Sequence, residues 1–142
     1  MKRKLGGMVA LALAIMTCLS GVALAKVSHA KAPVVKANST CGEFPAGHPV
    51  IGTVSFKRVG NLVTVTVVLN HGVPNSSYEV SLSTRPCAPR GSPFTMTTNS
   101  KGVGKGSGSF SVLATDKEFF ADPARVTPSV FEPNDTPFVR LR

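Results

Sequence analysis

Short runs of alternating apolar and polar residues, separated by turn residues, constrain the fold of this chain most strongly. In the clearest run, four apolar residues at every second position share one face of an extended segment: Val63, Val65, Val67 and Leu69. Thr64 and Thr66 lie between them, and β-branched residues favour a pleated strand over a helix. The segment from residue 61 to 69 is therefore predicted to be a half-buried strand.

Further strands are predicted where shorter runs show the same signs, at residues 50–57, 78–82, 94–98, 107–113, 125–131 and 138–141. Gly60-Asn61 predicts a tight hairpin turn between the first two of the strands along the chain. Only residues 115–124 could hold a short helix, with Thr115 or Asp116 as its cap and Pro123 as its end. About seven short strands predict an all-β fold, a single antiparallel Ig-like or Greek-key β-sandwich.

The first 25 residues have the pattern of a secretory signal peptide. Lys2, Arg3 and Lys4 precede an apolar run from residue 8 to 19, and Ala23-Leu24-Ala25 provides small residues for cleavage. The run is shorter than the roughly 20 residues that span a bilayer. We expect cleavage after Ala25; Ala30 is a second candidate, and either choice is expected to leave the fold unchanged. Lipidation of Cys18 is a minor alternative, because Thr17 precedes it where Gly or Ala is usual.

Cleavage would remove Cys18 and leave Cys41 and Cys87 as an even pair in an exported chain. Such a pair predicts one disulfide, since secreted proteins fold in oxidising compartments. Residues 26–40 hold three lysines and no aromatic residue, and they are predicted to form a flexible basic leader. The folded β-sandwich domain is expected to span residues 41–142.

The net charge of the whole chain is +9, and the predicted cleavage leaves 13 of its 16 cations against seven acidic residues. This balance favours anionic cell-envelope polymers or a protein partner. Nucleic acid is not expected as a partner, because export separates the chain from it and no basic cluster alternates with aromatic residues. The domain is expected to be secreted or associated with the cell envelope, without a transmembrane helix after cleavage.

No set of residues with the spacing of a catalytic or metal site is found in the sequence. His29, His48 and His71 form no His-x-His or His-x-x-x-His pair. Asp116, Glu118 and Asp122 lack the frame of a calcium loop. The glycines at every second position from 102 to 108 precede a strand-like segment, which favours a hairpin over a phosphate cradle. We therefore predict no catalytic residue, no metal and no cofactor.

One loop suggests binding. Arg85 and Arg90 flank Cys87 in the proline-rich segment 85–93, so that two cations would lie on a stiff, disulfide-anchored loop. The alternative is a loop whose prolines only prevent pairing at a sheet edge.

The run from Asn61 to Leu82, with Cys87, Phe94 and the Thr97–Gly102 turn, resembles a family of small exported bacterial β-sandwich proteins. The resemblance implies an architecture and no activity. The opening hairpin also resembles that of copper-zinc superoxide dismutase, but Tyr78-Glu79-Val80 stands where that enzyme has His-x-His, so no metal ligand carries over.

The sequence thus favours an exported, non-enzymatic binding or structural module. Two alternatives stay open: a secreted effector or inhibitor that acts through residues 85–92, and an enzyme or metal-binding protein whose site is assembled from distant residues.

Overall fold

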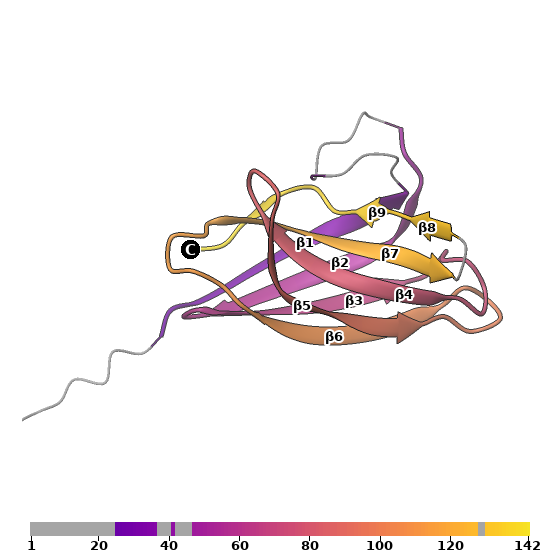
Figure 1. Ribbon diagram of the computed structural model, residues 1–142, viewed down its shortest axis with the longest axis horizontal. Coiled ribbons are helices and arrows are strands. Elements are labelled where there is room, and N and C mark those ends of the chain that lie inside the picture. Colours follow the sequence, from indigo (N-terminus) through magenta and orange to yellow (C-terminus); the bar gives the residue numbers. More distant parts are fainter. Residues whose placement is uncertain (1–24, 37–40, 42–46, 128–129) are drawn as a thin grey trace, which may run out of the picture.

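The computed structural model of the chain describes residues 25–36, 41, 47–127 and 130–142. These residues form ten β-strands and no helix, and the strands belong to two antiparallel sheets that lie against each other (Figure 1). Within the described part of the chain, there is no helix long and apolar enough to cross a membrane.

The first sheet, called sheet A, has the strand order β6-β3-β2-β1-β9. Its strands are β1 (Val27–Lys36), β2 (Val50–Val59), β3 (Leu62–Leu69), β6 (Gly104–Ser111) and β9 (Asn134–Asp135). The hairpin of β2 and β3 turns at Gly60, which has φ 58°, a left-handed conformation that glycine adopts without a steric penalty. This confirms the turn that the sequence predicts.

The second sheet, called sheet B, has the order β10-β7-β4-β5, with β8 paired to β7. Its strands are β4 (Ser77–Thr84), β5 (Ala88–Thr97), β7 (Glu118–Thr127), β8 (Val130–Glu132) and β10 (Val139–Arg140). Near the C-terminus the chain passes from β8 to β9 in sheet A and returns to β10 in sheet B. It thereby closes one side of the molecule.

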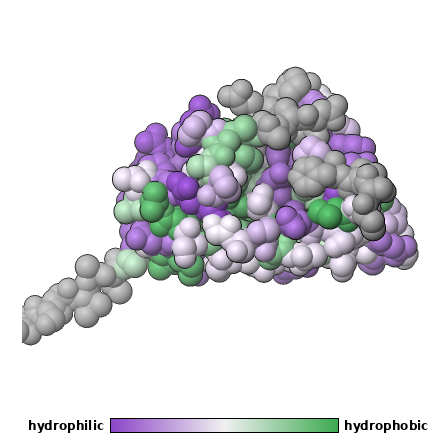
Figure 2. Space-filling view, in the orientation of Figure 1, coloured by the Kyte–Doolittle hydropathy of each residue, from purple (hydrophilic) through white to green (hydrophobic). Residues whose placement is uncertain are grey.

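Both sheets contribute to a single core. The four apolar residues of the valine strand are fully buried, at 0% exposure: Val63, Val65, Val67 and Leu69. From sheet B, Tyr78 and Phe119 are among the largest buried side chains that meet them. The period of two in the sequence therefore does report which face of β3 meets the core. The side of the surface seen in Figure 2 is largely hydrophilic or neutral, with separate hydrophobic areas.

The prediction of a flexible leader is wrong for residues 27–36. This segment forms β1, which pairs with β2 from Val27 opposite Val59 to Val35 opposite Val50. Ala32 and Val34 are buried, at 4% and 0% exposure. Cleavage after Ala30 would remove the first four residues of β1, so the cleavage site does matter to the fold. Residues 37–40 lie outside the described residues.

The possible helix at residues 115–124 is also corrected. Glu118 begins the ten-residue strand β7, which pairs with β4 along most of its length. The predicted loop at residues 85–93 is short, because β5 already begins at Ala88 and pairs with β4. Its prolines are tolerated because β5 lies at the edge of sheet B, where a missing backbone N–H breaks no ladder.

The predicted signal peptide, apart from Ala25, lies outside the described residues, and so does Cys18. The described residues confirm an all-β fold with two antiparallel sheets.

Candidate binding face

The outer face of sheet A is built by alternate residues of β1, β2, β3 and β6. Because these strands are in register, their outward residues form rows across the sheet. Three rows cross the middle of the face: His29–Lys57–Thr64–Ser109, Lys31–Ser55–Thr66–Ser107 and Pro33–Thr53–Val68–Lys105. We call the residues of these three rows the sheet A face.

Hydroxyl groups give the sheet A face a regular pattern. Thr64 Oγ1 and Ser109 Oγ lie 3.0 Å apart, and Thr66 Oγ1 and Ser107 Oγ lie 2.9 Å apart, each pair within hydrogen-bond distance across β3 and β6. The Ser107 hydroxyl also donates to the carbonyl of Val65, at 3.0 Å. These contacts hold the side chains in fixed positions on one side of the sheet, where they can offer hydrogen bonds to an extended ligand.

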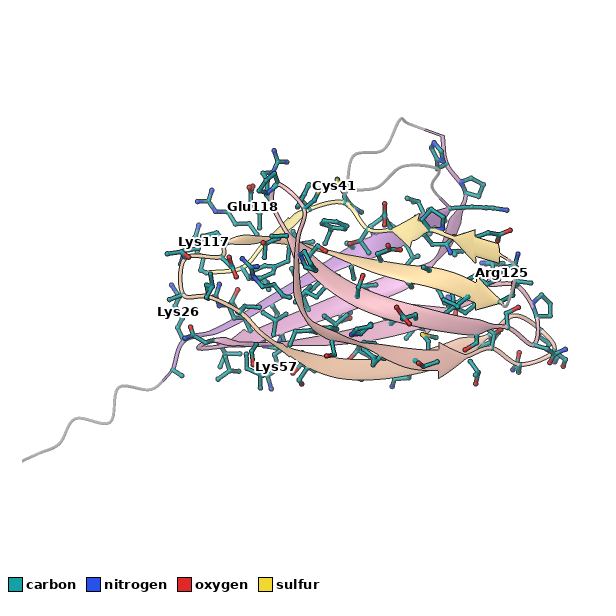
Figure 3. All side chains as sticks on the ribbon, in the orientation of Figure 1. Lys26, Cys41, Lys57, Lys117, Glu118 and Arg125 are labelled. Carbon is teal, nitrogen blue, oxygen red and sulfur yellow. A yellow bond between two sulfur atoms is a disulfide. The ribbon has the colours of Figure 1, made fainter. Side chains whose placement is uncertain are left out.

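The sheet A face carries cations and no acid. Lys31, Lys57 and Lys105 are exposed, and none of these three lysines makes an ion pair within the described residues. No Asp or Glu occurs anywhere in β1, β2, β3 or β6. Figure 3 labels Lys57 near the lower edge of the molecule in this view. The face can therefore attract anions without competition from its own carboxylates.

The arginines of the predicted binding loop are both partnered. Arg90 makes a bidentate pair with Asp116, with Nε–Oδ2 at 2.7 Å and Nη2–Oδ1 at 2.8 Å. The Arg90 guanidinium holds the pKa of Asp116 below its ordinary value. Arg85 Nε lies 3.2 Å from Glu118 Oε2, and Arg85 Cζ lies 4.5 Å from the ring centre of Phe138. The sequence predicts two cations on a stiff, disulfide-anchored loop, and in the fold each of these cations has an acidic neighbour.

These pairs surround a small cavity and a turn. A cavity of about 240 Å³ is lined by residues of both charges: Thr84, Arg85, Thr115, Asp116, Lys117 and Glu118. Arg58, only 4% exposed, donates to the carbonyls of Gly60, Leu113 and Asp116. Asp116 in turn accepts from the N–H of Leu113 at 2.8 Å. Because these groups already satisfy one another, we assign them a structural role.

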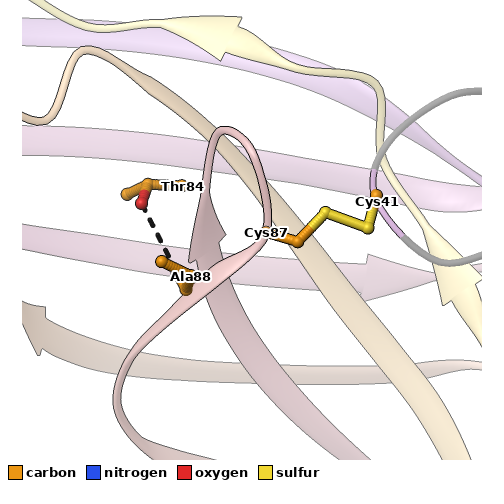
Figure 4. The surroundings of a disulfide bond; sticks show 4 residues. All are labelled: Cys41, Thr84, Cys87 and Ala88. Atoms are coloured by element: carbon orange, nitrogen blue, oxygen red, sulfur yellow. Dashed lines mark hydrogen bonds between the residues drawn. A yellow bond between two sulfur atoms is a disulfide. The ribbon is translucent and has the colours of Figure 1, made fainter.

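Cys41 and Cys87 form a disulfide with a Cα–Cα distance of 5.5 Å (Figure 4). The bond ties the turn between β4 and β5 to the segment that follows β1. This agrees with the predicted pairing.

The three histidines lie in different surroundings. His29 is on the sheet A face, His48 Nδ1 lies 2.6 Å from the carbonyl of Lys36, and His71 lines a cavity of about 70 Å³ near Tyr78. Among the described residues, no group of three or more His, Cys, Asp or Glu side chains is arranged to hold a metal ion. Asp116 and Asp122, two of the acids considered for a calcium loop, also lie in different elements. Asp116 belongs to the turn before β7, and Asp122 belongs to β7 itself.

A carboxyl pair, formed by the half-buried Asp122 and the buried Asp135, was missed by the sequence interpretation. Asp122 on β7 faces Asp135 on β9, and three of their four carboxyl oxygens have no hydrogen-bond partner when both groups are ionised. Burial raises the pKa of Asp122 to about 6, although the N–H of Asn134 donates to it, and raises the pKa of Asp135 to about 7. The available signal was an aspartate inside the apolar run Phe119-Phe120-Ala121-Asp122-Pro123.

No family model, curated protein or solved structure matches this chain. The sheet A face is therefore judged by its geometry and chemistry.

Proposed function

We propose that this chain is an exported, non-enzymatic β-sandwich module that binds an anionic polymer through the sheet A face. The observation that carries the proposal is that the sheet A face exposes three unpaired lysines, while none of the strands β1, β2, β3 and β6 contains an acidic residue. A sheet surface with spaced cations and ordered hydroxyls, whose three rows line neither of the two cavities described above, suits an extended chain of phosphate or carboxylate groups better than a small molecule.

Export is supported by the N-terminal sequence pattern and by the disulfide of Cys41 and Cys87, because such bonds persist in oxidising compartments. The Greek-key, Ig-like form of the sandwich is supported by the path of the chain. After the hairpin of β4 and β5 in sheet B, β6 returns to lie beside β3 in sheet A.

The binding test uses the chain from Lys26 to Arg142, which retains every described strand. Fluorescence anisotropy would measure its affinity for labelled long-chain polyphosphate and for polygalacturonate, a carboxylate polymer, at low and high salt. We expect affinity for at least one of these polymers, and we expect it to fall with salt because screening weakens exposed charge contacts.

The decisive variant is the triple substitution Lys31→Gln, Lys57→Gln and Lys105→Gln. Three exposed charge contacts at up to about 1 kcal/mol each predict a loss of about tenfold or more in affinity. The control is Lys36→Gln, Lys101→Gln and Lys117→Gln, which lowers the net charge equally but leaves the sheet A face intact. Equal weakening by both triple variants would show that net charge alone is responsible, and would overturn the proposal.

A further inference from the structure

A second surface lies at one end of the sheet A face, at the tip of the β2–β3 hairpin. The row beyond the hydroxyl rows is Val27–Val59–Leu62, whose members are paired across β1, β2 and β3 and are 49%, 38% and 46% exposed. Leu113, 58% exposed, belongs to the same end, because the N–H of Val112 donates to the carbonyl of Asn61 at 2.9 Å. We call these four residues the apolar tip.

The fold has no need for large apolar side chains at these positions. The core is filled by the inward residues of the same strands, such as Val63 and Phe56, at 0% and 1% exposure. Clustered apolar residues that stay exposed mark a contact surface more often than isolated ones do. We therefore expect the apolar tip to contact a partner that is itself apolar.

Cations border the apolar tip. Lys26 precedes Val27, Lys57 lies two residues before Val59, and both are labelled with Lys117 at the same end of the molecule in Figure 3. Arg142 joins them, since its N–H donates to Ser28 Oγ at 3.1 Å. The acids of this end are neutralised, because Asp116 pairs with Arg90 and Glu118 pairs with Arg85.

A partner with both properties is an anionic phospholipid surface. Exposed apolar side chains enter the boundary between headgroups and acyl chains, while lysines meet the phosphates. A second copy of this chain fits less well, because a symmetric contact would bring the same cations together.

We infer that the apolar tip docks the domain on anionic lipid membranes, with the sheet A face left free beside it. Cleavage after Ala25 would place an α-amino cation at Lys26 and add to the positive border. This inference does not depend on polymer binding, because the apolar residues form a different row; Lys57 is shared, as part of both the sheet A face and the cationic border.

The test measures how much of the chain from Lys26 to Arg142 sediments with lipid vesicles. The vesicles contain phosphatidylcholine alone, or phosphatidylcholine with about 30% phosphatidylglycerol. We expect binding to the anionic vesicles only. The double variant Val59→Thr and Leu62→Thr places β-branched threonines at both strand positions and keeps all charges, and it should weaken vesicle binding about tenfold. Its polyphosphate affinity should be unchanged, which separates the two proposals.

The matched control is Val103→Thr with Val126→Thr. These two valines lie outside the apolar tip, and their exposed fractions, 42% and 38%, are similar to those of Leu62 and Val59, 46% and 38%. The control variant should bind vesicles like the parent chain. The sequence has no tryptophan, so Leu113→Trp provides a single reporter whose emission should shift to the blue on anionic vesicles, whereas Val103→Trp should not. Parent binding that is absent, or that survives the Val59 and Leu62 changes, would overturn the inference.

Discussion

At the residue scale, the carboxyl pair of Asp122 and Asp135 dominates the acid–base behaviour of the fold. An ionised carboxylate only accepts hydrogen bonds, so two buried carboxylates cannot satisfy each other. A proton held between them turns one into a donor, and it also removes one buried negative charge. Glu79, on the neighbouring strand β4, adds further repulsion. The pair thus ties β7 to β9 most firmly when it is protonated.

The prediction concerns pH. The folded pKa values, about 6 and about 7, lie above the ordinary value of 3.8. The stabilisation is then fully present below pH 4 and is lost as the pH rises through 6 and 7. Because the pair shares one proton, we count a single pKa difference of about 2; at ~1.4 kcal/mol for each unit of pKa difference, the loss is on the order of 3 kcal/mol. Urea unfolding of the parent chain at several pH values from 4 to 8 measures it.

Asp135→Asn supplies a permanent amide donor to Asp122, so this variant should show a flatter pH dependence and gain stability at pH 7.5. Glu118→Gln, on the same strand β7 but with a side chain that is 42% exposed, serves as the control and should change the profile little. A steep pH dependence that persists in the Asp135→Asn variant would contradict the shared proton.

At the element scale, the approach of β5 to β6 depends on glycine. A Cβ atom added to Gly108 would lie 2.3 Å from the ring of Phe94, and one added to Gly106 would lie 2.7 Å from Cβ of Met96. Both contacts are far below van der Waals distance, and they join the edges of the two sheets. The glycine repeat of β6 therefore makes room for side chains of β5.

Gly108→Ala should destabilise the fold by about 1–3 kcal/mol, the usual effect of overpacking. Ser109→Ala, the next residue on the same strand but with its side chain on the sheet A face, should stay within about 0.5 kcal/mol of the parent. Urea midpoints measure both. Equal stability of the Gly108→Ala and Ser109→Ala variants would show that β5 and β6 do not approach closely.

At the scale of the whole molecule, the disulfide joins residues 46 positions apart. Closure of such a loop in the unfolded chain is worth up to about 4 kcal/mol in the entropy model, and measured values are commonly lower. Cys41→Ser with Cys87→Ser should lower the unfolding free energy by about 2–4 kcal/mol. The parent chain from Lys26 to Arg142, reduced with dithiothreitol, should show the same unfolding free energy as this double variant. A urea midpoint equal to that of the oxidised parent, in both the variant and the reduced chain, would contradict the stabilising role of the disulfide.

Much of the fold could be predicted from local patterns. Residues 61–69 were assigned correctly because valine and threonine alternate without interruption, and Gly60 marks the turn. Strand β1 was missed because its inward residues include the small Ala30 and Ala32, whose weak hydrophobic signal is obscured by lysines on the other face. Strand β7 was missed because it is buried on both sides at Phe119 and Phe120, which erases the alternation.

The candidate sites were less predictable. The loop arginines were singled out from their spacing, but their acidic partners, Asp116 and Glu118, come from a segment more than twenty residues away. The sheet A face combines β1 and β6, whose residues Lys31 and Lys105 are separated by about half of the chain. No local pattern reports such a juxtaposition.

By itself, the sequence determined where most strands lie, which side of β3 is buried, and which two cysteines join. Those properties depend on near neighbours, because side chains alternate along a strand with a period of two. The tertiary structure alone decided which strands are adjacent, and hence the acid-free sheet A face, the apolar tip and the contact of Asp122 with Asp135. These depend on hydrogen bonds and burial between distant segments, which the period of a single strand does not specify.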